Sequence, residues 1–295
     1  MNMKNLFWIL LLGMMAACSG KQKQDHAEER LISVTMEPLR FFVEQIAGDK
    51  YKVISMVPKG SSPETYDPTP GQLVDLGKSN LYFKIGYIGF EQMWMDKLAA
   101  NAPEMKIIDT SAGIDLITDG HRHGHDHEHV TGVEPHIWNS PDNALIIARN
   151  IRNALCEADP ANANYYQARF ENLQKVILET DNQLREILKN ADKAFLIYHP
   201  ALSYFARDYG LRQISIEEGG KQPSPAHLKA LIDECRKGNV SVIFVQQEFD
   251  TRNAELIAKE TGTRIVPINP LSYDWQEEMI KVAKALSKEG GNQPD

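Results

Sequence analysis

Two histidines beside prolines stand shortly before predicted helices, where a side chain can face a ligand. His199 follows the apolar run at residues 194–198, which is typical of a buried parallel strand, and Pro200 can open the next helix. His136 lies just upstream of the helix that Pro141 opens. Ligands of open α/β sheets bind at the carboxyl ends of strands. Each imidazole can therefore ligate a transition metal, or it can simply cap a loop.

Carboxylates and one amide occupy comparable places near predicted strand ends. Glu64 lies in the Pro/Gly/Ser-rich loop at residues 58–70, and Glu217, Glu248 and Asn269 follow later strands. Two imidazoles and one carboxylate suit a divalent transition metal, zinc above all, while manganese and iron tolerate oxygen ligands. If the edges of two sheets face each other, we expect these side chains to share one cleft.

The elements that must position these residues alternate between strand and helix, which predicts an α/β fold with parallel sheets. We expect two lobes, each a roughly four-stranded parallel sheet flanked by helices. The predicted strands are residues 31–36, 53–57, 81–85 and 106–108 in the first lobe, and 194–198, 211–216, 240–245 and 264–268 in the second.

A long helical pattern separates the two sets of strands. Asp159 and Pro160 are typical of a helix start, and apolar residues keep helical spacing from Tyr166 to Ile187. Some thirty residues at 1.5 Å each would form a rod of about 45 Å. We therefore expect an N-terminal lobe at residues 31–158, a rigid linking helix at 159–190, a C-terminal lobe at 191–288 and a tail at 289–295.

The amino terminus is predicted to direct export. Lys4 precedes a short apolar run at residues 6–15, and Met15-Ala16-Ala17-Cys18 follows. This segment resembles a bacterial lipoprotein lipobox, which implies a signal peptide at residues 1–17 and a lipid on the sulfur of Cys18. Residues 18–30 are polar and read as a tether. We expect the protein to be anchored in the cell envelope, on the periplasmic side.

A histidine-rich loop at residues 120–132 interrupts the strand–helix alternation. Exposed imidazoles are good ligands for zinc, copper and nickel, so the loop is predicted to hold metal weakly. The alternative is a solvated insertion with no role. The histidines are His121, His123, His125, His127 and His129.

The composition limits the remaining function classes. The chain has 295 residues, of which 42% are hydrophobic and 24% charged, as expected for a globular protein. Its net charge of −8 disfavours a nucleic-acid partner. Cys156 and Cys235 both lie in helical patterns, and we expect two separate thiols.

Several motifs together resemble the metal-binding proteins of bacterial ABC importers for zinc and manganese, specifically the zinc-type branch. Residues 134–141 match the family pattern Asp-Pro-His-x-Trp-x-x-Pro except at Glu134, and residues 159–166 and 199–211 are also similar. The loop around Glu64 resembles the pattern Gly-x-x-Pro-His-x-Tyr-x-Pro. The resemblance covers about residues 32–286 and implies two lobes, joined by a rigid helix, with one metal between them.

The resemblance assigns the metal ligands to Glu64, His136, His199 and Asn269. Glu64 stands where the family has histidine, and Asn269 stands where aspartate is usual. A glutamate can still ligate through a harder oxygen, whereas a neutral asparagine carbonyl is a poor zinc ligand. The fourth ligand is therefore left open among Asn269, Glu217, Glu248 and water.

The resemblance implies a lipid-anchored solute-binding protein that captures Zn²⁺, with Mn²⁺ or Fe²⁺ as alternatives, and delivers it to an ABC import permease. We expect a monomer without enzymatic activity. A metal-binding surface adhesin or store is a second hypothesis. A zinc hydrolase is a third, because two histidines and a glutamate with an open position also occur in hydrolytic sites; however, the chain has no His-Glu-x-x-His motif.

Overall fold

The structure is a computed structural model that describes residues 30–118 and 132–287. The predictions for the signal peptide, for Cys18, for the five histidines of the loop and for the tail concern residues outside these ranges.

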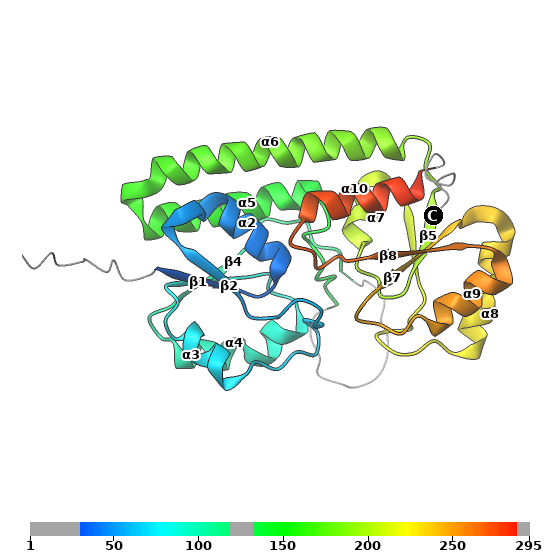
Figure 1. The fold of residues 1–295 in the computed structure, drawn as a ribbon, viewed down its shortest axis with the longest axis horizontal. Coiled ribbons are helices and arrows are strands. Elements are labelled where there is room, and N and C mark those ends of the chain that lie inside the picture. The colour runs from blue at the N-terminus through cyan, green and yellow to red at the C-terminus, as the bar shows by residue number, and fades with distance from the viewer. Residues whose placement is uncertain (1–29, 119–131, 288–295) are drawn as a thin grey trace, which may run out of the picture.

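Each of the two lobes contains a four-stranded parallel sheet (Figure 1). The strand orders are β2-β1-β3-β4 and β6-β5-β7-β8, so both sheets have the same topology. This confirms the predicted fold class. The strands are β1 (Leu31–Val34), β2 (Lys52–Ser55), β3 (Leu81–Lys84), β4 (Lys106–Asp109), β5 (Ala194–Ile197), β6 (Arg212–Ser215), β7 (Val242–Gln246) and β8 (Arg264–Ile268).

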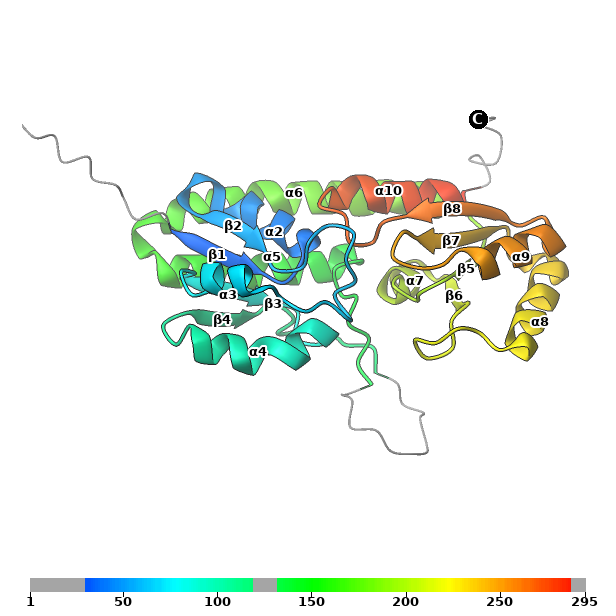
Figure 2. The ribbon, with the colours of Figure 1, turned by 60° about the horizontal axis from the view of Figure 1, so that its bottom comes forward.

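Helices cover both faces of each sheet, as parallel strands require. In the first lobe α3 and α4 lie on one face, and α2 and α5 lie on the other (Figures 1 and 2). In the second lobe α8 and α9 cover one face of the sheet, and the other face packs toward α6 and α10. The helices are α2 (Glu37–Ala47), α3 (Pro70–Leu76), α4 (Gly89–Asn101), α5 (Pro141–Ala158), α6 (Ala163–Leu188), α7 (Ser203–Tyr209), α8 (Pro225–Glu234), α9 (Arg252–Thr261) and α10 (Trp275–Leu286).

Strand β5 is apolar throughout because both of its faces are buried. Phe195 and Ile197 pack into the core that continues toward α6 and α10, whereas Ala194 and Leu196 pack into a separate core under α8 and α9. Successive side chains of a strand point to opposite faces of the sheet, and here both faces are covered. The buried strand places the next residues, including His199, at its carboxyl end.

The long helix α6 begins at Ala163, slightly later than predicted, because Pro160–Asn162 forms a turn of 3₁₀ helix. Asp159 does not cap that turn; its carboxylate accepts hydrogen bonds from Tyr166 and Arg30. The 26 residues of α6 span about 39 Å. The helix packs on α2 and α5 of the first lobe and on α10 of the second.

The two lobes share one continuous hydrophobic core. It runs from strands β1 and β3, through α5 and α6, to β5, β7 and α10. The aromatic residues Trp138, Tyr204 and Phe205 are all buried in it. The lobes are therefore packed against each other as well as linked by α6.

Cys156 and Cys235 are free thiols, as expected. In residues 30–118 and 132–287, no helix combines the length and the apolar character that crossing a bilayer requires.

Candidate metal centre

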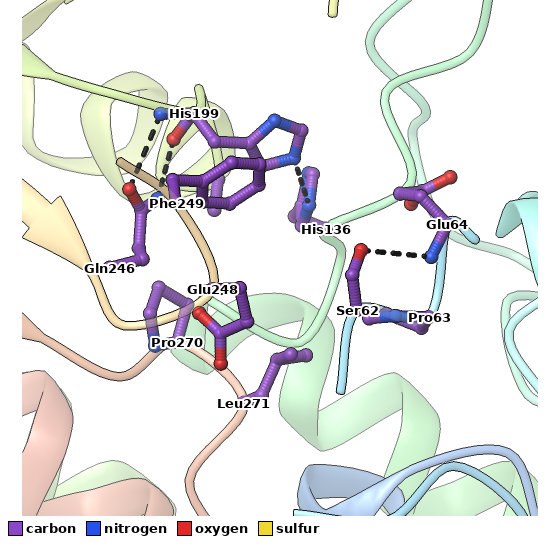
Figure 3. Close-up of a pocket in the computed structure, with 11 residues that line it drawn as sticks. Ser62, Pro63, Glu64, His136, His199, Gln246, Glu248, Phe249, Pro270 and Leu271 are labelled. Carbon is purple, nitrogen blue, oxygen red and sulfur yellow. Dashed lines mark hydrogen bonds between the residues drawn. The ribbon is translucent and has the colours of Figure 1, made fainter. Parts of the chain in front are cut away.

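A small cavity between the lobes brings together three of the sequence-predicted ligands (Figure 3). Glu64 and His136 come from the first lobe and His199 from the second, and Glu248 and Phe249 also line the cavity. Its volume is about 30 Å³. One water-sized particle needs roughly 10–15 Å³, so the cavity suits an ion with little accompanying water.

The two imidazoles point their Nε2 atoms at each other, at a distance of 3.3 Å. The rings are nearly perpendicular, at 72°, with centroids 5.1 Å apart. In a tetrahedral zinc site with Zn–N bonds of about 2.0–2.1 Å, two ligand nitrogens lie roughly 3.3 Å apart. His136 and His199 therefore already have the spacing of two ligands of one zinc ion.

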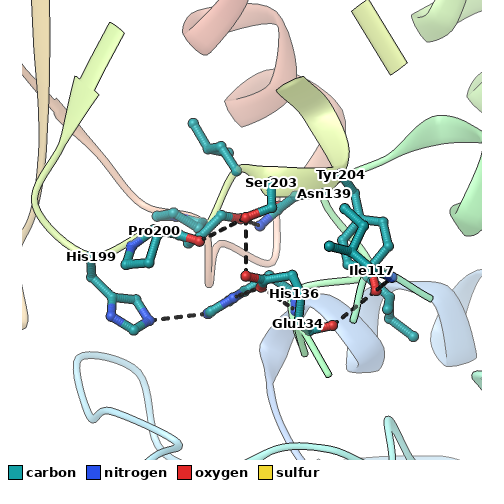
Figure 4. Close-up of polar contacts among 12 residues, drawn as sticks. Ile117, Glu134, His136, Asn139, His199, Pro200, Ser203 and Tyr204 are labelled. Carbon is teal, nitrogen blue, oxygen red and sulfur yellow. Dashed lines mark hydrogen bonds and ion pairs between the residues drawn. The ribbon is translucent and has the colours of Figure 1, made fainter. Parts of the chain in front are cut away.

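Glu134 fixes the ring of His136 (Figure 4). Its Oε1 accepts hydrogen bonds from Nδ1 and from the backbone N–H of His136. Its other oxygen accepts a hydrogen bond from Ser203, 3.0 Å away in the second lobe, and its backbone carbonyl accepts one from Tyr204 at 2.9 Å. Because a carboxylate only accepts, the proton of His136 is on Nδ1 and the lone pair of Nε2 faces the cavity.

Glu217 holds His199 in the same way. The Nδ1 of His199 donates to the buried carboxylate of Glu217 over 3.0 Å. Gln246, at the end of β7, exchanges two hydrogen bonds with the backbone of His199, and Phe249 stacks on the imidazole at 5.0 Å. Both rings are thus held in the orientation that metal-ligating histidines adopt, with a carboxylate behind each ring.

The amino terminus of α4 holds Glu64. The backbone N–H of Gly89 donates to Oε2 of Glu64 over 3.1 Å, which leaves Oε1 as a possible metal ligand. The backbones are in such close contact that a Cβ on Gly89 would lie 2.6 Å from the carbonyl oxygen of Glu64. A glycine is therefore required at this position for the loop and the helix to meet.

Asn269 is not among the residues that line the cavity. Its side-chain oxygen accepts a hydrogen bond from the backbone N–H of Leu271 at 3.1 Å, and Pro270 and Leu271 form the cavity wall instead. Within the described residues, no three His, Cys, Asp or Glu side chains converge closely enough to enclose an ion. The two imidazoles face each other, and a metal site at this place would need a carboxylate to turn toward them.

The electrostatics around His136 favour a positive charge in the cavity. Burial of the ring disfavours its protonated form, but the charge and hydrogen bond of Glu134 outweigh this effect and raise the pKa of His136. Burial likewise opposes ionisation of Glu134, and the interactions with His136 hold its pKa below the usual range. The same field that stabilises a proton on this ring stabilises a metal cation beside it.

Sequence reasoning missed two of the supporting residues and left a third undecided. Glu134 lies inside the motif that contains His136, so its proximity in sequence could have suggested the partner. Gly89 carried no signal, because its role depends on a contact with a loop 25 residues away. Glu217 was left open as a fourth ligand, and its position behind His199 accounts for its burial.

Several hydrogen bonds join the two lobes near the cavity. The indole of Trp138 donates to the carbonyl of Pro270, and the indole of Trp275 donates to the carbonyl of Trp138, both over 2.7 Å. Asn139 donates to the carbonyl of Ala201 at 2.9 Å. These hydrogen bonds fasten the segment that follows His136 to the second lobe.

Comparisons with known proteins agree with the motif-based resemblance. A family model described as ZnuA, zinc-uptake complex component A periplasmic, matches residues 32–289. The high-affinity zinc uptake system protein ZnuA of Bacillus subtilis is 28% identical over 283 residues, which cover 91% of this chain and 88% of that protein. The manganese ABC transporter substrate-binding lipoprotein PsaA of Streptococcus pneumoniae is 27% identical over 269 residues, which cover 88% and 86%.

Solved structures agree with the sequence matches. A crystal structure of ZnuA has a TM-score of 0.80 to this structure at 36% sequence identity, with 86% of this chain and 96% of that chain covered. The family-model match spans most of the chain, from β1 to the end of α10. The chain belongs to the ZnuA family of periplasmic zinc-uptake components.

Proposed function

We propose that this protein is the solute-binding component of an ABC importer, which captures a divalent transition metal between its lobes and delivers it to a permease. Zinc is the cargo that the site fits best. The observation that carries this proposal is the pair of facing Nε2 atoms, 3.3 Å apart and each backed by a carboxylate. Relatives named for zinc and for manganese support the class of cargo.

Release follows from the division of the ligands between the lobes. His136 and Glu64 belong to the first lobe and His199 to the second, so a separation of the lobes that also breaks the hydrogen bonds between the His136 segment and the second lobe pulls the imidazoles apart. A carrier of this design holds its cargo tightly and still surrenders it to a membrane partner.

The proposal also covers regions outside the described residues. A lipid on Cys18 would anchor the protein on the periplasmic side of the envelope, and the polar stretch after it would act as a tether. The five histidines between 120 and 132 would hold additional metal more weakly than the interlobe site. We propose a monomeric carrier without catalytic activity, since the family is described as an uptake component.

The test is a zinc titration of the purified chain by calorimetry with a competing chelator. We expect His136→Ala and His199→Ala each to abolish the tight site, because each removes one of two preorganised nitrogen ligands. His227→Ala is the matched control; its Nε2 lies 3.1 Å from the carbonyl of Ser215, and it does not line the cavity. Unchanged affinity in either of the first two variants would contradict the proposal.

A second variant separates the interlobe site from the histidine-rich loop. Deletion of residues 120–130 should remove weak zinc equivalents and leave the tight site unchanged. Loss of tight binding on this deletion would instead favour a metal store based on the loop. Hydrolysis of ester or peptide substrates by the zinc-loaded chain would favour the enzyme hypothesis.

A further inference from the structure

The interlobe cavity lacks an obvious fourth protein ligand. The oxygen of Asn269 is engaged by the backbone N–H of Leu271, and this residue does not line the cavity. Glu217 is buried behind His199 and bound to its Nδ1, on the side of the ring away from the cavity. Two of the four candidates are therefore committed to other contacts.

We infer that Glu248 supplies the fourth protein ligand, through a carboxylate oxygen. This inference rests on the proposed function. Glu248 lines the same cavity as His136, His199 and Glu64 (Figure 3). It is next to Phe249, which stacks on His199, so its backbone is held beside the imidazole pair.

The topology of the second sheet supports this assignment. Glu248 follows β7 and His199 follows β5, and these two strands are neighbours at the point where the strand order reverses. Ligands of open parallel sheets bind in the crevice at this switch point. Asn269 follows β8, one strand farther from it.

The carboxylate of Glu248 is available for a metal. Within residues 30–118 and 132–287, its hydrogen bond is to the side chain of Gln247, over 3.2 Å to Oε1, and it has no ion-pair partner there. A half-buried carboxylate with one weak neutral contact can turn toward a cation at little cost. By contrast, Glu217 would have to give up its contact with His199.

This ligand set affects which metal the site prefers. Two imidazoles with Glu64 and Glu248 would make a site in which two negative charges balance a divalent cation in a small cavity. Two hard oxygen ligands also favour manganese and iron more than a histidine-rich set does. Replacing Glu248 should therefore weaken manganese binding at least as much as zinc binding.

The experiment compares Glu248→Gln with Asn269→Ala in chelator-competition titrations of the full chain with zinc and with manganese. We expect Glu248→Gln to weaken zinc binding at least tenfold, because the amide retains the shape and loses the charge. Asn269→Ala should change the affinity less than threefold. Equal affinity of Glu248→Gln and the unchanged chain would overturn the inference, as would a larger loss in Asn269→Ala.

Cobalt provides a readout that is independent of affinity. The visible absorption of bound Co²⁺ reports its ligand set, so Glu248→Gln should alter the spectrum and Asn269→Ala should leave it unchanged. The reverse pattern would assign the ligand to Asn269. The His199→Ala variant separates a failure of the proposed function from a failure of the Glu248 assignment. If His199→Ala still binds zinc tightly, the proposed function fails. If His199→Ala loses tight binding and Glu248→Gln keeps it, only the assignment of Glu248 is overturned.

Discussion

At the scale of single residues, the central feature is a carboxylate behind each imidazole. Glu134 and Glu217 determine which nitrogen of each ring carries the proton and where the other nitrogen points. Glu217 acts within its own lobe, whereas Glu134 also accepts a hydrogen bond from Ser203 across the junction. The two residues are therefore expected to contribute to affinity without touching the metal.

Glu217→Ala tests this positioning role. Loss of such a partner typically weakens metal affinity by about 10- to 100-fold, because the ring loses its fixed tautomer and orientation. Glu218→Ala is the matched control, since the neighbouring carboxylate accepts from the backbone of Ser224 at 2.7 Å and does not contact His199. Chelator competition measures the zinc affinity of both variants. Equal affinities of the two variants would show that Glu217 does not position the imidazole.

Glu91, in the first turn of α4, is buried at the carboxyl edge of the first sheet and does not line the cavity. It accepts hydrogen bonds from Thr35 and from the backbone N–H groups of Ile85 and Gly86. Burial raises the pKa of Glu91 to about 7, in spite of these hydrogen bonds and of the charge of Lys84. The folded chain therefore binds this proton more tightly than the unfolded chain does.

The consequence is a pH dependence of folding stability. The contribution of Glu91 is fully present below its unfolded pKa of about 4.5 and is lost as the pH rises through about 7. A shift of this size corresponds to roughly 3 kcal/mol between pH 4.5 and pH 8. Urea unfolding of metal-free protein should show a smaller stability loss over this range in Glu91→Gln. Parallel pH profiles of the two proteins would contradict the assignment.

At the scale of elements, the approach of α4 to the loop before α3 positions Glu64. Gly89 begins α4, and its N–H donates to the carboxylate. The next residue, Phe90, donates its backbone N–H to the carbonyl of Pro63 at 2.8 Å, so the loop and the helix terminus are joined on both sides of Glu64. A helix terminus therefore holds Glu64, the proposed ligand that lies on a loop.

Gly89→Ala should disturb this contact. Its Cβ would lie 2.6 Å from the backbone oxygen of Glu64, and relief of such a clash costs about 1–3 kcal/mol. We expect lower thermal stability and weaker zinc binding. Gly71→Ala, in the first turn of α3, is the matched control, because the nearest atom to its Cβ is 4.0 Å away. Indistinguishable melting temperatures and affinities in the two variants would count against this role.

The elements were largely predictable from the sequence, and the orientations of the ligands were not. Apolar runs such as residues 194–198 identified the central strands, because both faces of a parallel sheet are buried there. The edge strands β4 and β6 are less buried and were found from the alternation of strands and helices. Prolines marked the starts of α5 and α8. The Leu271 contact of Asn269 and the Gly89 contact of Glu64 depend on packing between segments, which no local pattern encodes.

At the scale of the whole molecule, a shared core and the helix α6 restrict how the lobes can move. The core is continuous from β1 to α10, and the junction is crossed by the hydrogen bonds of Trp138 and Trp275. A wide hinge opening would expose this apolar surface to water, at about 25 cal/mol for each Å². The structure therefore favours small displacements at the junction, and His136 separates from His199 only when the hydrogen bonds that hold its segment to the second lobe break.

A crystal structure of the zinc-loaded chain, with anomalous diffraction recorded on both sides of the zinc absorption edge, tests the central claim most directly. The account predicts one strong anomalous peak between the lobes, about 2 Å from the Nε2 atoms of both His136 and His199. A fully loaded crystal whose zinc peak lies away from either imidazole would contradict it.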